Sequence, residues 1–209
     1  SLAAMFWLHR RYPRLSPSQC PQLYAILGQV LGKARAQWPA VLLSPESAVF
    51  CCAFGFRRPY LLISRGALKR LSAPELEAVV AHEVGHLQRW DGWLGFVVLT
   101  FRHILFFNPI VYFLCQRILK EAELAADDLA LAFGPSRLAY AESLVKVSRS
   151  WGELPRGPLL TSQFFGCRAT LKARVLHALE EVPQGKRSRD NWLMGGLAAT
   201  LLVGLFFIC

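Results

Sequence analysis

Two histidines stand four residues apart in the segment His82-Glu83-Val84-Gly85-His86, inside a run whose apolar residues recur at helical spacing to about residue 90. The run begins with Ser72-Ala-Pro-Glu75, which has the form of a helix capping box. Residues four apart share one face of a helix, so both imidazoles can reach a single ion, with Glu83 beside them. The spacing therefore predicts a metal-binding helix. The alternative is a surface helix that carries these residues by coincidence.

A zinc site of this kind needs a third protein ligand while one position stays open for water. The segment Glu123-Leu-Ala-Ala-Asp127 meets that need, because its two carboxylates lie one helical turn apart and the alanines permit close helix packing. Glu123 is placed to bind the ion, and Asp127 to accept a hydrogen bond from a ligand histidine. On spacing alone, Glu121 and Asp128 compete for these two roles.

The chemistry expected of such a site is the activation of a water molecule. Zinc lowers the pKa of its bound water toward about 7, and Glu83 is placed to remove the proton so that hydroxide attacks a peptide carbonyl. The developing oxyanion needs a further donor. Spacing does not identify that donor, and the candidates are Lys120, His103, Tyr140 and Arg174.

The remaining pattern predicts an α+β fold that is mainly helical and contains a small β-sheet. Helical periodicity covers residues 17–38, 72–90, 92–107, 110–133, 135–151 and 167–182. Runs rich in β-forming residues, separated by proline-containing breaks, cover residues 40–43, 49–56 and 60–64.

Apolar residues make up 54% of the chain, and much of the excess lies in two stretches. Residues 191–209 carry no charge and approach the length that crosses about 30 Å of hydrocarbon, which predicts a transmembrane helix. Lys186, Arg187 and Arg189 precede this stretch, and the positive-inside rule then places the domain before it in the cytoplasm. A hydrophobic core helix is the alternative.

The second stretch, residues 94–119, is interrupted by Arg102, His103 and Asn108-Pro109. A single span is disfavoured, because charges near the centre of a bilayer are costly. We predict a hydrophobic hairpin over residues 92–119 that lies in or against the membrane interface, or packs on other helices.

These observations divide the chain into four parts. We expect a basic juxtamembrane segment at residues 1–16, a zinc metallopeptidase domain at 17–182, a basic linker at 183–190 and a transmembrane helix at 191–209. The net charge of +10 fits basic flanks of membrane segments. Because no zinc-finger spacing, RNP-like motif or helix-turn-helix pattern occurs, the expected partners are a protein or peptide substrate and a lipid membrane, with no nucleic acid.

Several segments match a known pattern in order: Pro59-Tyr-Leu-Leu-Ile-Ser-Arg-Gly66, the run from Glu75 to His86 with Asp91 five residues beyond, Phe107-Asn-Pro-Ile-Val111, and Glu123-Leu-Ala-Ala-Asp-Asp128. With these residues the chain resembles the integral-membrane gluzincins typified by the BlaR/MecR β-lactam sensor-transducers. Membrane peptidases of the Ste24/HtpX type are related to them. The Phe-Asn-Pro segment favours the BlaR/MecR-type branch.

The resemblance implies a gluzincin zinc-peptidase fold with Zn²⁺ as its cofactor. In this fold His82, His86 and Glu123 would bind the zinc ion. Glu83 would be the catalytic base, and Asp127 would support a ligand histidine. The resemblance also implies an integral membrane protein, which in bacteria would lie in the inner membrane. The family's zinc domain faces the cytoplasm.

The resemblance also implies that the edge strand of the sheet pairs with an extended substrate, so that Cys52, Ala53 and Phe54 line the cleft. An ordinary sheet strand is the alternative. The implied function is that of a membrane-anchored, zinc-dependent endopeptidase that cleaves a cytoplasmic regulatory protein, or itself, in signal transduction. A quality-control peptidase of the Ste24/HtpX type and a non-catalytic membrane signalling module are the other hypotheses.

Overall fold

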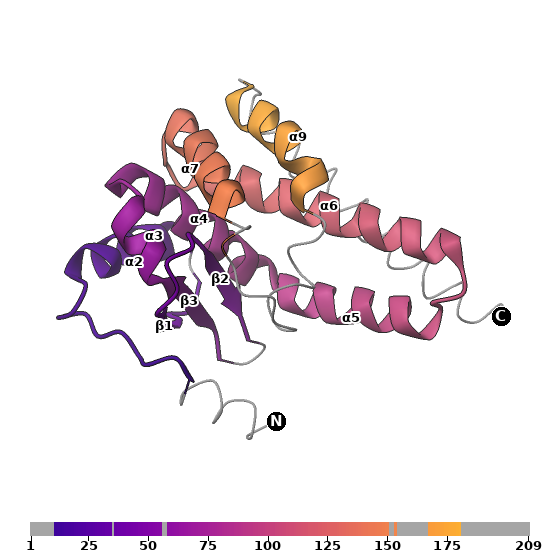
Figure 1. Cartoon of the computed structure of the whole chain (residues 1–209), viewed down its shortest axis with the longest axis horizontal. Coiled ribbons are helices and arrows are strands. Elements are labelled where there is room, and N and C mark those ends of the chain that lie inside the picture. Colours follow the sequence, from indigo (N-terminus) through magenta and orange to yellow (C-terminus); the bar gives the residue numbers. More distant parts are fainter. Residues whose placement is uncertain (1–10, 35, 56–57, 151–152, 154–166, 181–209) are drawn as a thin grey trace.

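The computed structural model describes residues 11–34, 36–55, 58–150, 153 and 167–180 (Figure 1). The described chain is mainly helical with one small sheet, which confirms the α+β prediction at that level. Its elements are α2 (Pro21–Ala34), β1 (Ala40–Ser44), β2 (Cys51–Phe54), β3 (Tyr60–Ser64), α3 (Arg65–Arg70), α4 (Ala73–Arg89), α5 (Asp91–Ile104), α6 (Pro109–Ala132), α7 (Arg137–Ser150) and α9 (Cys167–Leu179). The predicted linker at 183–190 and the predicted transmembrane helix at 191–209 lie outside the described residues.

The three β-rich runs form one sheet with the strand order β1-β3-β2. The central strand, β3, pairs parallel with β1 and antiparallel with β2, and all five of its residues are buried. Leu61 and Ile63 join the main core, whereas Tyr60 and Leu62 belong to a smaller core with Phe50. Alternation along β3 thus fills both faces of the sheet, and β2 is left as an edge strand.

The short helix α3 is absent from the sequence prediction. The Oγ atom of Ser64 caps it by accepting a hydrogen bond from the backbone N–H of Ala67 at 2.9 Å. Gly66 is required there, because a Cβ atom on it would lie 2.0 Å from the carbonyl oxygen of Ser47. A helix of six residues is too short to produce a periodic apolar pattern, so the sequence gives no signal for it.

Helix α4 lies at the centre of the fold and packs against α2, α6, α7 and β2. Most of its apolar stripe is buried: Ala78, Val80, Ala81 and Val84 are 0% exposed, and Leu87 near its end is half-buried. Glu75 in the first turn accepts hydrogen bonds from the backbone N–H and the hydroxyl of Ser72, each at 2.8 Å, as the capping-box pattern predicts. The helix with the two histidines is therefore held from several sides.

Helices α5 and α6 form an antiparallel hairpin that extends away from the sheet (Figure 1). The break at Asn108-Pro109 lies at its turn, where Asn108 Oδ1 accepts a hydrogen bond from the backbone N–H of Ile110 at 2.9 Å. The hairpin's own core consists of Val98, Val111, Cys115 and Ile118. No helix in the described part of the chain combines the length and the apolar character needed to cross a bilayer.

Glu75 provides a test of how α4 is anchored. Burial raises the pKa of its carboxyl group, but hydrogen bonds from Lys146 and Ser72 outweigh that effect and leave the pKa below its ordinary value. A lowered folded-state pKa stabilises the fold above the unfolded pKa of about 4.3, and this stability is lost as pH falls through the folded pKa. We expect Glu75→Gln to lower the free energy of unfolding by about 1–3 kcal/mol at pH 7, and by less below pH 4.

Urea unfolding of the detergent-solubilised chain at pH 7 and pH 3 measures this difference. Glu77→Gln is the matched control, because Glu77 lies on the same helix and the described residues provide its side chain with no hydrogen bond. An equal loss in the two variants, or a loss that does not change with pH, would contradict the anchoring role.

Candidate metal centre and active site

A close contact between α4 and α6 brings the two sequence motifs together. A Cβ atom on Gly85 would lie 3.2 Å from the carbonyl oxygen of Ala126 and 3.6 Å from its Cα atom. Ala125 and Ala126 are buried, at 6% and 0% exposure. Small residues on both helices therefore allow the backbones to approach closely, as the alanines between the two carboxylates predict.

His82, His86 and Glu123 offer three ligand atoms that all lie within 4.8 Å of one another. The Nε2 atoms of the two histidines are 3.1 Å apart. Glu123 places Oε2 3.6 Å from His82 Nε2 and Oε1 3.7 Å from His86 Nε2. A tetrahedron with metal–ligand bonds of 2.0–2.1 Å has edges of about 3.3 Å, so two imidazole nitrogens and a carboxylate at these distances fit a zinc ion.

The second nitrogen of each histidine is also engaged. His86 Nδ1 lies 2.8 Å from Asp91 Oδ2. Tyr140 donates its hydroxyl proton to Asp127 Oδ1 at 2.6 Å, and its oxygen lies 2.9 Å from His82 Nδ1. Partners of this kind keep the proton on Nδ1, direct Nε2 toward the metal site and fix the orientation of the rings. His82 Nε2 also lies 3.3 Å from Nη2 of Arg174.

Asp91 reaches His86 because the chain turns sharply between α4 and α5. Trp90, at that junction, is left-handed with φ 59°, and its backbone N–H bonds to the carbonyl groups of His86 and Leu87. Arg89 Nε lies 3.2 Å from both carboxylate oxygens of Asp91 and holds that side chain in place. The αL residue thus ends one helix and directs the first residue of the next helix back toward the site.

Arg174 of α9 connects the carboxylates behind the histidines. Its Nε donates to Asp127 Oδ2 at 2.8 Å, its Nη2 donates to Asp127 Oδ1 at 2.6 Å, and its Nη1 pairs with Glu123 Oε2 at 2.8 Å. The side chain is only 4% exposed. Burial by itself would raise the pKa of both carboxyl groups. Arg174 and His82 outweigh it and lower the pKa of Asp127 to about 2, and Arg174 with both histidines lowers the pKa of Glu123 well below its ordinary value.

The same carboxylates favour positive charge at His82. Burial acts to lower the pKa of this imidazole, but hydrogen bonds to Asp127 and Glu123 outweigh it and raise the pKa to about 9. The carboxylates thus attract a proton to a nitrogen that can also bind a metal, so the charge distribution suits a cation at this place.

Glu83 lies beside the histidines and against the edge strand β2. Its Oε2 accepts a hydrogen bond from the backbone N–H of Ala53 at 2.6 Å, and its side chain is buried. Burial raises the pKa of Glu83, although both histidines and the Ala53 N–H act in the opposite direction. Cys52, Ala53 and Phe54 thus lie on the strand next to the candidate base, with the Ala53 N–H already paired to it.

The competing carboxylates face other partners. Glu121 pairs with Arg117 at 3.2 Å on the surface of α6, and Asp128 pairs with His177 at 2.7 Å. Glu123 is therefore the carboxylate that joins the histidines, and Asp127 is the one behind His82.

Two of the four candidate oxyanion donors, Tyr140 and Arg174, lie in the site, but both are bonded to Asp127. His103 lies near the outer end of α5, where it lines a separate cavity. The sequence did not assign roles to Asp91 or to the hydrogen bonds of Tyr140 and Arg174. The sequence did single out Asp91, because it lies five residues beyond His86 in the pattern that carries the family resemblance. Tyr140 and Arg174 are 58 and 92 residues from His82, so helical spacing could not reveal their contacts with it.

Comparison with known proteins identifies the family. The chain belongs to the family described as BlaR1 peptidase M56, whose model matches residues 1–176. It is 37% identical over 78 residues to a protease HtpX homolog of Acaryochloris marina, covering 36% of this chain and 26% of that protein. It is 26% identical over 125 residues to the regulatory protein BlaR1 of Bacillus licheniformis, covering 59% of this chain and 20% of that protein.

A protease HtpX homolog of Moorella thermoacetica is 26% identical over 190 residues, covering 72% of this chain and 62% of that protein. The chain therefore spans less than two thirds of each of these relatives. The resemblance to the BlaR/MecR type, with HtpX-type relatives, is confirmed.

Arg174 gives the site a measurable effect on stability. Removing it leaves two carboxylates close together without their cation, so we expect Arg174→Met to lower the free energy of unfolding by about 3–5 kcal/mol in chelator. Adding Asp127→Asn should make the combined loss smaller than the sum of the two single losses, because the two groups interact directly.

Lys172→Met is the control, because Lys172 lies on the exposed side of α9 and should change stability by less than about 0.5 kcal/mol. Additive losses from Arg174→Met and Asp127→Asn would show that the guanidinium does not act through this carboxylate.

Proposed function

We propose that the chain is a zinc-dependent endopeptidase with the gluzincin fold, in which His82, His86 and Glu123 hold the metal. The observation that carries the proposal is the convergence of these three side chains: the two Nε2 atoms are 3.1 Å apart, and the Glu123 carboxylate lies 3.6 Å from one and 3.7 Å from the other. Two imidazoles and one carboxylate, with one position left open, are typical of catalytic rather than structural zinc. Membership of a peptidase family supports the same activity.

Zinc bound in this site would supply a Lewis acid that acidifies water and polarises a peptide carbonyl. Glu83 then accepts the proton of the attacking water and later delivers it to the leaving amine. Its raised pKa, caused by burial, brings the carboxyl group closer to the working pH, and this favours transfer in both directions. Asp127, Tyr140 and Arg174 hold the ligands in place.

Substrate would bind along β2 in an extended conformation. This strand is at the edge of the sheet and runs beside Glu83, so a peptide added to it lies next to the catalytic base. Cys52, Ala53 and Phe54 would line that cleft. Binding through backbone hydrogen bonds suits protein substrates of varied sequence.

The substrate we favour is a cytoplasmic regulatory protein, or the chain itself, cleaved in response to a membrane signal. The family match and the similarity to the regulatory protein BlaR1 support this choice. Similarity to protease HtpX homologs supports the alternative of a broader membrane protein quality-control peptidase. A non-catalytic signalling module is the remaining alternative. The Glu83→Gln variant distinguishes it from the two peptidase hypotheses.

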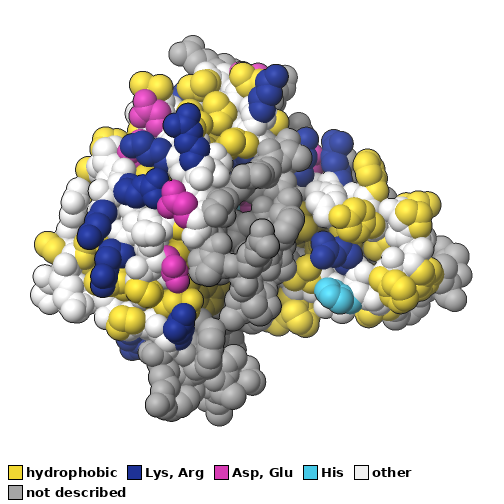
Figure 2. All heavy atoms as spheres, in the orientation of Figure 1, with side chains coloured by type: hydrophobic (Ala, Val, Ile, Leu, Met, Phe, Trp, Pro, Cys, Tyr) yellow, Lys and Arg dark blue, Asp and Glu magenta, His cyan; other side chains and the backbone are white. Residues whose placement is uncertain are grey.

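The hairpin of α5 and α6 would attach the peptidase to the membrane. Hydrophobic side chains gather on this end of the molecule (Figure 2). Phe106, Phe107, Ile110 and Phe113 are between 63% and 81% exposed, which is unusual for aromatic and branched side chains in water. Residues 183–190 and 191–209 would add a basic linker and a transmembrane helix, with the peptidase domain of residues 17–182 on the cytoplasmic side.

Glu83 separates catalysis from metal binding. We expect Glu83→Gln to keep zinc at one ion per chain and to lower proteolysis by about 10²–10⁴-fold, because only the proton acceptor is lost. His82→Ala should lose both zinc and activity. The measurements are metal analysis of the purified protein and mass-spectrometric mapping of new N-termini in membranes of expressing cells.

Many new N-termini in unrelated membrane proteins would favour quality control, whereas one or two would favour a regulatory substrate. Wild-type cleavage by Glu83→Gln would rule out the mechanism, and no cleavage by the wild-type protein with zinc bound would favour the non-catalytic module.

The choice of third ligand has its own test. We expect Glu123→Ala to weaken zinc binding by more than about 100-fold, beyond the effect of partners that contact only a ligand. Glu121→Ala is a matched control on the same helix, since it removes only a surface ion pair with Arg117. A chelator competition titration measures both affinities, and a larger loss in Glu121→Ala would show that the other carboxylate binds the metal.

A further inference from the structure

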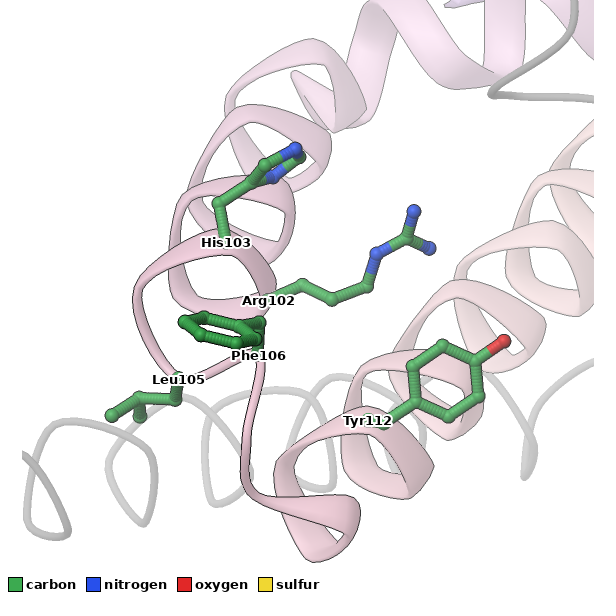
Figure 3. Close-up of a pocket in the computed structure, with 5 residues that line it drawn as sticks. All are labelled: Arg102, His103, Leu105, Phe106 and Tyr112. Atoms are coloured by element: carbon green, nitrogen blue, oxygen red, sulfur yellow. The ribbon is translucent and has the colours of Figure 1, made fainter.

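A cavity of about 430 Å³ opens at the outer end of the α5–α6 hairpin, away from the metal centre. Its lining consists of Arg102, His103, Leu105, Phe106 and Tyr112. Figure 3 shows the Arg102 side chain extending from α5 toward α6, and the Tyr112 ring with its hydroxyl group lying along α6. Polar donors and apolar walls therefore meet in one hollow.

Arg102 is the distinctive residue of this cavity. It is the sole lysine or arginine between residues 92 and 116, and this stretch contains no aspartate or glutamate. The Tyr112 ring lies beside it, with the ring centroid 5.8 Å from the guanidinium carbon. A positive charge in apolar surroundings, with no carboxylate paired to it among the described residues, favours an anion from outside the protein.

The group that suits Arg102 is a phosphate. A guanidinium group presents two parallel N–H donors that match two phosphate oxygens, and the charge strengthens both hydrogen bonds. Tyr112, which lines the same cavity from α6, adds a hydroxyl donor. The His103 ring borders the cavity, with its Nδ1 lying 2.7 Å from the Leu99 carbonyl oxygen.

The apolar rim indicates that this phosphate belongs to a lipid. Phe106 and Phe107 at the turn are 81% and 70% exposed, and Ile104 and Ile110 beside them are 51% and 63% exposed. Arg102 lies in the last turn of α5, which ends at Ile104, and so lies close to the turn that contains Phe106. Interfacial helices bury their apolar side by about 5–10 Å, so insertion of this turn brings Arg102 to the level of the lipid phosphates. Free phosphate would not need that rim.

We propose that the cavity binds the phosphate of an anionic phospholipid headgroup, with Arg102 and the Tyr112 hydroxyl as donors and the turn of the hairpin inserted among the acyl chains. This inference rests on the proposed attachment of the hairpin to the membrane, but it does not depend on zinc or on proteolysis. It adds a lipid preference that membrane attachment alone does not require.

The test is a titration of the whole detergent-solubilised chain with phosphatidylglycerol or phosphatidylcholine, followed by native mass spectrometry. We expect the wild-type protein to bind phosphatidylglycerol more tightly, and Arg102→Gln to weaken that binding about tenfold, the effect of one charge-assisted hydrogen bond. Tyr112→Phe should cause a smaller loss while it keeps the ring. Arg117→Gln, an exposed arginine on α6, should bind like the wild type.

Three results would overturn the proposal: equal loss in Arg102→Gln and Arg117→Gln, no preference between the two lipids, or complete displacement of the lipid by inorganic phosphate at tens of millimolar. Circular dichroism of each variant reports on folding, and Tyr112→Phe keeps the proposal testable if Arg102→Gln does not fold.

Vesicle flotation and metal analysis of the same preparations separate the hypotheses. A chain that floats with phosphatidylcholine vesicles and binds zinc, but shows no lipid preference that depends on Arg102, would contradict this site alone. A chain that floats with neither kind of vesicle would contradict membrane attachment as well.

Discussion

The close packing of α4 on α6 is the contact on which the site depends. Gly85 lies against the backbone of Ala126, and a Cβ atom on Gly85 would lie 3.2 Å from the Ala126 carbonyl oxygen, so a side chain there would require the two helices to shift. The two histidines belong to one helix and Glu123 belongs to the other, so helix separation sets the distance between the ligand atoms. The sheet and α2 hold α4 from its other sides.

The charges of the side chains at this helix contact determine which kind of ion the site favours. Glu123 and Asp127 are negative and close together, and Arg174 compensates for only one of the two charges. The remaining negative charge faces the Nε2 atoms of the histidines and favours a cation there. Glu83 lies outside this network, is bound to the edge strand, and has a raised rather than a lowered pKa. The helices thus provide a group of metal ligands and a separate carboxyl group suited to proton transfer.

The sequence predicts the features that depend on spacing along one helix. It indicated the histidine pair, the capping box at Glu75, the hairpin break and the choice of Glu123 or Glu121 as ligand. Three-dimensional packing was needed to decide between those carboxylates, because Glu121 lies only two residues away. Contacts between distant elements could not be predicted from spacing, and the hydrogen bonds of Tyr140 and Arg174 are of this kind. Helix α3 was missed because six residues are too few for a periodic apolar pattern, and the left-handed turn at Trp90 was missed because it depends on a single residue.

X-ray absorption spectroscopy of the zinc-loaded protein tests the central claim most directly, because it identifies the atoms bound to the metal. The account predicts two imidazole nitrogens and carboxylate or water oxygens at about 2.0–2.2 Å, with no sulfur. Glu123→Ala should change the oxygen contribution and leave both imidazoles bound. Sulfur at about 2.3 Å, which would indicate a cysteine ligand such as Cys52, or a spectrum without two imidazoles, would contradict the proposed metal centre.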